Sequence, residues 1–161
     1  MARSGGQARE ASLPALLGAA QRTYTNAIRS ALSASGFEDM PRTGYWITGL
    51  LAREGSGLGD LASRLTVSKQ ATSRLIDVLV RRDYCARVPD PTDRRRTTLV
   101  LTDRGHRAAA EIRRAVARLN EDVSARVDAD GIAATRATLA TLVAMGRETR
   151  AGASGAPAAL R

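Results

Sequence analysis

Cysteine and histidine are nearly absent from this chain, with one of each among 161 residues. A single cysteine excludes a disulfide within the chain, and one cysteine with one histidine does not make a zinc cluster. The sequence also lacks a nucleophile paired with a base, clustered carboxylates and a glycine-rich phosphate loop, so an enzyme is not predicted. We therefore expect a protein that works without a metal or a cofactor.

Long hydrophobic runs are lacking as well. No segment stays apolar over the roughly 20 residues that a membrane-spanning helix needs, and residues 1–10 lack the apolar core of a signal peptide. We expect a cytoplasmic protein with no membrane partner. Aromatic residues make up 3% of the chain, which is too few to indicate a particular ligand.

Positive charge, in contrast, is abundant. The formal net charge is +9, and hydrophobic residues make up 43% of the chain, which is typical of a globular protein. Residues 68–107 contain ten basic residues against five acidic ones and so carry +5 of the net charge. Basic charge gathered in one quarter of the chain favours a nucleic-acid partner.

Two short amphipathic segments begin this basic region. Residues 56–65 predict a short helix, and apolar residues at three- and four-residue spacing predict a second helix over residues 66–82. The apolar stripe of the second helix consists of Val67, Ala71, Leu75, Val78 and Leu79. Two such helices are typical of a helix-turn-helix, in which the second helix reads DNA. An ordinary solvated helix would show a similar polar face, so this pattern alone leaves both interpretations open.

A β-hairpin is predicted directly after the second helix. Residues 84–88 and 97–101 are short β-prone runs, and the segment between them contains Pro89 and Pro91, which favour a turn. The tip of this hairpin is rich in arginine. It has the form of a wing beside a helix-turn-helix.

The far side of the hairpin carries a motif that points to a family. The segment DRRRTTLVLTDRG, residues 93–105, resembles the Asp-x-Arg followed by Leu-x-Leu-Thr-x-x-Gly of the multiple-antibiotic-resistance regulator (MarR) family of bacterial transcription factors. The resemblance covers roughly residues 40–107. It implies a mainly α fold with a small β-hairpin wing (α+β), a winged helix-turn-helix with long N- and C-terminal dimerisation helices.

The resemblance also assigns roles within the wing. It implies that Arg95 enters a minor groove, where the negative potential suits a guanidinium, while the carboxylate of Asp93 orients that side chain. The alternative is that Asp93 and Arg95 only hold the hairpin together. Arg94 and Arg96 are expected to contact phosphates.

The polar face of the second helix supplies the candidates for reading base edges in the major groove. Gln70 can pair with adenine, and Arg74 can pair with guanine or a phosphate. Such side chains also occur on many exposed helices that do not bind DNA. The full candidate set is Ser68, Lys69, Gln70, Thr72, Ser73 and Arg74.

Helices are also predicted on both sides of this domain. One covers about residues 12–33 and ends at Ser35-Gly36, and the next begins near residues 38–41 and reaches about residue 53, with Trp46 facing inward. Thr102 is the expected N-cap of a helix that runs to about Val127. Residues 128–131 are expected to break it before a last helix from about residue 132 to residue 150.

These predictions divide the chain into five regions. We expect a flexible N-terminus at residues 1–11, a dimerisation helix at 12–36, the winged helix-turn-helix domain at 37–106, C-terminal dimerisation helices at 107–150 and a disordered tail at 151–161. The chain is too short to cover the apolar stripes of its flanking helices, so we expect an isologous homodimer.

The predicted function is sequence-specific regulation of transcription. A two-fold dimer with two reading helices requires a double-stranded operator that is pseudo-palindromic. The resemblance implies a repressor that a small-molecule effector can release. Candidates for lining an effector pocket are Tyr24, Tyr45 and Trp46, although core packing explains these aromatic residues equally well.

Two alternative functions remain open at this point. A sequence-independent architectural DNA-binding protein would share the basic charge. A thiol-sensing repressor would use Cys85, although a cysteine on a predicted strand is more often a buried, inert thiol.

Overall fold

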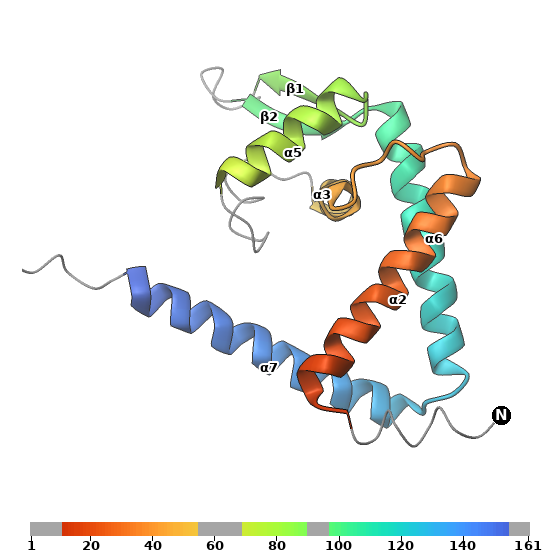
Figure 1. The fold of residues 1–161 in the computed structure, drawn as a ribbon, viewed down its shortest axis with the longest axis vertical. Coiled ribbons are helices and arrows are strands. Elements are labelled where there is room, and N and C mark those ends of the chain that lie inside the picture. Colours follow the sequence, from red (N-terminus) through yellow and green to blue (C-terminus); the bar gives the residue numbers. More distant parts are fainter. Residues whose placement is uncertain (1–10, 55–68, 90–96, 155–161) are drawn as a thin grey trace, which may run out of the picture. The chain divides into compact units, whose positions relative to one another are not determined.

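The computed structural model describes residues 11–54, 69–89 and 97–154, in two compact units, residues 1–119 and 120–161. The described residues form five helices and one antiparallel hairpin, shown in Figure 1. This architecture confirms the predicted fold class. In chain order the elements are α2 (Leu13–Ala34), α3 (Gly44–Glu54), α5 (Lys69–Arg81), β1 (Cys85–Pro89), β2 (Thr97–Leu101), α6 (Asp103–Ser124) and α7 (Ala129–Ser154).

Helix α2 begins and ends where the sequence predicts. A proline stands in its first turn, where its missing N–H costs no hydrogen bond. Gly36 follows the helix with a φ of 78°, a left-handed conformation that favours glycine. The N–H of Phe37 then donates to the carbonyl of Leu32 at 2.9 Å, which closes the helix end.

One hydrophobic core joins α2, α3, α5, the hairpin and the first half of α6. At its centre Ile47 of α3 and Leu79 of α5 are fully buried, together with Tyr84 just before β1. The remaining buried members of the cluster are Ile28, Leu32, Phe37, Tyr45, Leu51, Ile76, Cys85, Leu99, Ala108, Ile112 and Ala115. Since every one of these elements contributes, the core fixes α5 against the hairpin.

Helix α3 departs from the sequence prediction in two ways. It begins at Gly44 instead of at residues 38–41, because the chain first makes turns through residues 38–43. Trp46, predicted to face inward, is 50% exposed. A residue turns about 100° per position in a helix, so burying Ile47 and Leu51, four residues apart, directs Trp46 outward.

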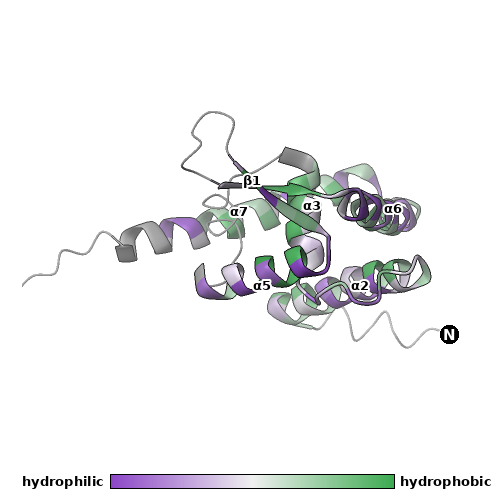
Figure 2. Cartoon of the chain, turned by 90° about the horizontal axis from the view of Figure 1, so that it is seen from above, coloured by the Kyte–Doolittle hydropathy of each residue, from purple (hydrophilic) through white to green (hydrophobic). Residues whose placement is uncertain are grey.

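The buried stripe of α5 is also rotated from the predicted one. Figure 2 shows both hydrophilic and hydrophobic residues along this helix. Its buried residues are Thr72, Ile76 and Leu79, whereas Ala71 is exposed. The prediction missed this face because Thr72 was counted as polar, although the methyl group of a threonine packs well in a core.

Helix α6 starts as predicted and ends earlier. The hydroxyl of Thr102 accepts the N–H of Gly105 at 3.1 Å, which confirms Thr102 as the N-cap. The helix ends at Ser124, so Val127 lies beyond it.

Helix α7 belongs to the second unit and is longer than predicted. The carboxylate of Asp128 accepts the N–H of Gly131 at 2.7 Å, so Asp128 caps α7 and Gly131 lies in its first turn instead of in a break. The helix continues to Ser154, into the segment predicted as a tail. Several large apolar side chains of this unit are exposed, namely Val123, Val127, Leu142, Val143 and Met145. None of the described helices is long and apolar enough to cross a membrane.

Candidate nucleic-acid interface

The exposed face of α5 presents three polar side chains that are free to meet a ligand. Gln70, Ser73 and Arg74 are exposed, and within the described residues none of them has a hydrogen-bond or ion-pair partner. Lys69 is the first residue of α5 but its side chain lies outside the described part, as does Ser68 altogether. The first two turns of α5 therefore offer an amide, a hydroxyl and a guanidinium, the groups that pair with base edges and phosphates.

Thr72 does not belong to this face. Its side chain is 2% exposed, and its hydroxyl has no hydrogen-bond partner among the described residues. A buried, unpaired hydroxyl lowers stability by about 1–3 kcal/mol. We correct the prediction that Thr72 contacts DNA, because a side chain packed into the core cannot reach a base edge from the opposite side of its helix.

An ion pair links α5 to the first strand of the hairpin. Arg87 of β1 donates to the carboxylate of Asp77 at 2.5 Å. This pair offsets the only negative charge on α5, which would otherwise repel a phosphate backbone. Sequence reasoning missed it, because no helical or strand periodicity connects residues ten positions apart in two different elements.

The hairpin lies directly after α5 and pairs in a single register. Cys85 lies opposite Leu101, and Pro89 lies opposite Thr97 at the end where residues 90–96 connect the two strands. Pro89 is the last residue of β1, a position where a missing N–H is tolerated. The predicted wing contacts Asp93, Arg94, Arg95 and Arg96 lie outside the described residues and stay predictions.

The threonine and the glycine of the Leu-x-Leu-Thr-x-x-Gly motif have a structural role at the end of the hairpin. The hydroxyl of Thr102 donates to the carbonyl of Asp83, and its N–H donates to the carbonyl of Tyr84 at 3.2 Å. A Cβ atom on Gly105 would lie 2.0 Å from the carbonyl oxygen of Tyr84. The motif therefore lets the start of α6 approach the chain segment that leaves α5.

Cys85 is a free and buried thiol in this structure. It is 2% exposed, and burial raises the pKa of the thiol to about 11. Burial therefore disfavours the reactive thiolate at neutral pH.

We expect Ellman's reagent to label the native protein at least about 100-fold more slowly than the unfolded chain at the same pH, since reaction needs an exposed thiolate. The guanidinium-unfolded protein is the control, because it contains the same single cysteine. Equal labelling rates would restore Cys85 as a sensor candidate.

The aromatic residues predicted for an effector pocket are only partly brought together. The rings of Tyr45 and Trp46 lie 5.2 Å apart, and the hydroxyl of Tyr45 is 2.9 Å from that of Thr25. Tyr45 is buried in the core, Trp46 is exposed and Tyr24 is half-buried. A hollow of about 260 Å³ lies at the end of α2, and none of these three residues lines it.

The described residues hold no group of histidine, cysteine and acidic side chains that could bind a metal ion. The candidate interface consists of the exposed polar face of α5 and the hairpin that follows this helix.

The comparisons with known proteins agree with this geometry. Residues 39–96 match the model of the MarR family, over the stretch that contains α3, α5 and β1. Over these residues the chain is similar to the MarR family. No curated protein matches the chain.

Several solved structures share the fold over most of the chain. The MarR transcriptional regulator from Methanosarcina mazei has a TM-score of 0.69 at 20% identity and covers 85% of this chain and 97% of its own. The MepR–DNA complex of S. aureus has a TM-score of 0.69 at 16% identity, and the match covers 83% of this chain and 96% of MepR. The transcriptional repressor CouR bound to a 23-mer DNA duplex has a TM-score of 0.65 at 25% identity, and the match covers 82% of this chain and 92% of CouR. The fold of this chain is thus shared with two proteins whose structures were solved in complex with DNA.

Proposed function

We propose that this chain is a MarR-family transcriptional regulator, a homodimeric repressor that binds a pseudo-palindromic operator in double-stranded DNA. The observation that carries the proposal is the exposed face of α5. Gln70, Ser73 and Arg74 project from this face without partners in the described structure, and the helix is followed directly by the hairpin.

The chemistry of this face suits base recognition. A glutamine can bond both the N6 and N7 positions of adenine, and an arginine can bond both acceptors of guanine. Because Asp77 is paired with Arg87, the positive charge of Arg74 is not opposed on its own helix. We propose that Ser68 and Lys69 extend the contact at the start of α5, and that Arg95, oriented by Asp93, enters the minor groove with Arg94 and Arg96 on phosphates.

Homodimerisation accounts for the apolar side chains that α2 and α7 leave exposed. Leu13, Leu16 and Leu17 of α2 are exposed, as are Val143 and Met145 of α7. Exposed apolar side chains that gather on a helix can mark an interaction site. We propose that residues 12–36 and 107–150 of two copies bury these surfaces, so that two α5 helices lie about 34 Å apart and enter successive major grooves.

Two of the structural neighbours support this proposal because their structures contain DNA. CouR is a transcriptional repressor bound to a DNA duplex, and MepR is in complex with DNA. Release by an effector requires a ligand that prefers a dimer arrangement unable to bind DNA. Tyr24, Tyr45 and Trp46 remain our candidates for contacting that ligand, and the exposed ring of Trp46 is the most accessible of them.

An architectural role is the competing function, and a competition assay separates the two. A specific repressor on its operator should survive a large excess of random duplex, because specific sites bind about 10³ to 10⁷ times tighter than non-specific ones. Complete displacement by an equal mass of random duplex would instead support sequence-independent binding. The salt dependence does not discriminate, since both functions neutralise phosphates.

A further inference from the structure

The carbonyl groups at the end of α5 point toward the first turn of α6. Helix α5 closes with Asp83 in a left-handed conformation, with a φ of 58°, and the N–H of Tyr84 donates to the carbonyl of Leu79 at 2.9 Å. This closure leaves the carbonyls of residues 82, 83 and 84 without a partner inside α5. Polar groups of this kind must be bonded elsewhere.

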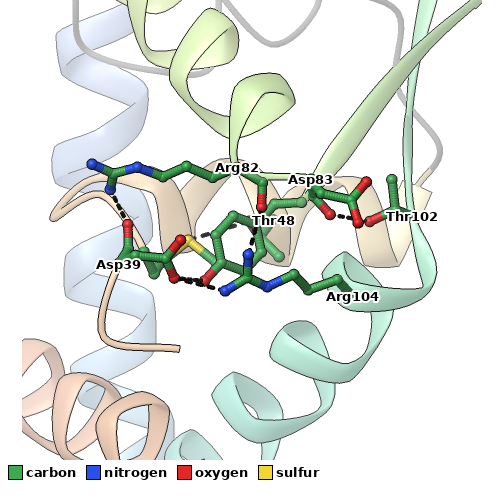
Figure 3. A network of polar contacts seen from close by, with 8 residues as sticks. Asp39, Thr48, Arg82, Asp83, Thr102 and Arg104 are labelled. Atoms are coloured by element: carbon green, nitrogen blue, oxygen red, sulfur yellow. Dashed lines mark hydrogen bonds and ion pairs between the residues drawn. The ribbon is translucent and has the colours of Figure 1, made fainter. Parts of the chain in front are cut away.

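Three consecutive carbonyls are bonded by the start of α6. Arg104 donates to the carbonyl of Arg82 at 2.8 Å, and Thr102 bonds the carbonyls of Asp83 and Tyr84 through its hydroxyl and its N–H. Figure 3 shows Arg82, Asp83, Thr102 and Arg104 converging at this junction. We call these contacts the α5–α6 clasp.

Arg104 extends the clasp to a third segment. Its guanidinium donates to the carboxylate of Asp39 at 2.9 Å, in the connection between α2 and α3, and lies 4.6 Å from the centre of the Tyr84 ring. The hydroxyl of Tyr84 donates to the same carboxylate at 2.6 Å. The side chain of Arg82 in turn donates to the carbonyl of Asp39. Burial and the bond to Asp39 raise the pKa of Tyr84, so the phenol stays protonated as a donor.

The position of Arg104 in its own helix is electrostatically unfavourable. It is the second residue of α6, where the helix dipole disfavours a cation. The C-terminal end of α5 favours a cation, and this is where the guanidinium lies. The stability of α6 therefore does not explain this arginine, whereas its contacts with α5 and Asp39 do.

We propose that Arg104, held by Asp39, is a positioning residue for operator recognition: it fixes the direction of the reading helix α5 relative to α6. The inference rests on the function proposed above. The chain continues from the clasp along α6 into residues 107–150, which we assign to the dimer, so the clasp sets how the two reading helices are aimed at their half-sites. The Leu-x-Leu-Thr-x-x-Gly motif includes Thr102 and Gly105 but leaves the position of Arg104 unspecified.

The test measures how the full-length dimer tolerates changes in half-site spacing. Arg104→Met keeps an apolar side chain against Tyr84 and removes the guanidinium, which bonds the carbonyl of Arg82 and the carboxylate of Asp39. Asp39→Asn is the second variant, because it keeps a bond acceptor for Tyr84 while removing the charge. Arg42→Met is the matched control, since Arg42 is exposed in the same α2–α3 connection as Asp39 and takes no part in the clasp.

Duplexes carry the selected operator with its half-sites moved apart or together by one or two base pairs, and one duplex carries a single half-site. Wild type and Arg42→Met should prefer one spacing. For Arg104→Met we expect about 2- to 30-fold weaker binding at that spacing and a flatter preference across spacings, with single half-site binding unchanged. The double variant Arg104→Met/Asp39→Asn should lose no more operator affinity than Arg104→Met alone, because the two residues act through one contact.

Two results would overturn the inference. Arg104→Met could keep the wild-type spacing preference and lose only thermal stability, which is the outcome of a purely structural ion pair, or it could weaken the single half-site equally, which is the outcome of a lost phosphate contact. Failure of the proposed function looks different, because wild type itself would then show no preferred inverted repeat. If Arg104→Met does not fold, the spacing preference and single half-site affinity of Asp39→Asn test the inference instead.

Discussion

Replacing Gly105 by alanine is expected to lower the free energy of unfolding by about 3 kcal/mol, the upper end of the usual cost of overpacking. The new Cβ atom would lie 2.0 Å from the carbonyl oxygen of Tyr84 and 3.2 Å from a methyl group of Leu101. The first of these atoms belongs to the backbone and is also bonded to the N–H of Thr102, so it cannot move aside as a flexible side chain can. The start of α6 must separate from the end of α5.

Helix propensity alone gives the opposite sign for this substitution. An alanine inside a helix is about 1 kcal/mol more favourable than a glycine. Gly49 of α3 supplies the control, because a Cβ atom there would meet nothing within 4 Å. Denaturant titration should therefore show Gly49→Ala equal to or more stable than wild type and Gly105→Ala much less stable. A neutral or stabilised Gly105→Ala would mean that the α5–α6 clasp is loose in solution.

Replacing Arg74 by alanine is expected to weaken operator binding by about 1–3 kcal/mol, or roughly 5- to 150-fold, and to relax the choice of base at one position of each half-site. Arg74 is exposed on α5 and has no partner among the described residues. Its removal should therefore cost little folding stability. Binding to the selected operator and to its single-base variants, measured by fluorescence anisotropy, gives both quantities.

The control for this prediction removes the same charge elsewhere. Arg113 is an exposed arginine of α6, and Arg113→Ala should leave base preference unchanged. If Arg74→Ala weakens binding equally for all sequences and lowers the salt dependence, Arg74 contacts a phosphate. If Arg74→Ala keeps the operator affinity and the base preference of wild type, Arg74 is not part of the interface.

The elements that could be predicted from the sequence are those that depend on neighbours along the chain. Capping by Thr102 and the turn at Gly36 follow from local hydrogen bonding and backbone conformation, and both are confirmed. The hairpin strands follow from β-prone runs separated by prolines. The motif that ends at Gly105 pointed to the family, and the structure supplies the physical reason for its glycine.

The remaining features depend on residues that are distant in sequence. Asp39 and Arg104 are 65 positions apart, and no periodic pattern connects them. Thr72 was placed on the DNA face because polarity was taken as exposure, and Trp46 was placed inside because size was taken as burial. In both cases the packing of neighbouring residues on the same helix decided the direction of the side chain.

Operator recognition by a two-fold dimer can be tested by selecting bound duplexes from a random pool with the 161-residue chain at near-physiological salt. We expect an enriched inverted repeat with half-site centres about 10 base pairs apart, or a multiple of that distance, because two α5 helices related by two-fold symmetry must enter the major groove on one face of the duplex. Salt-sensitive binding without any enriched sequence would contradict it. That result would show that the exposed face of α5 contacts DNA through phosphates alone.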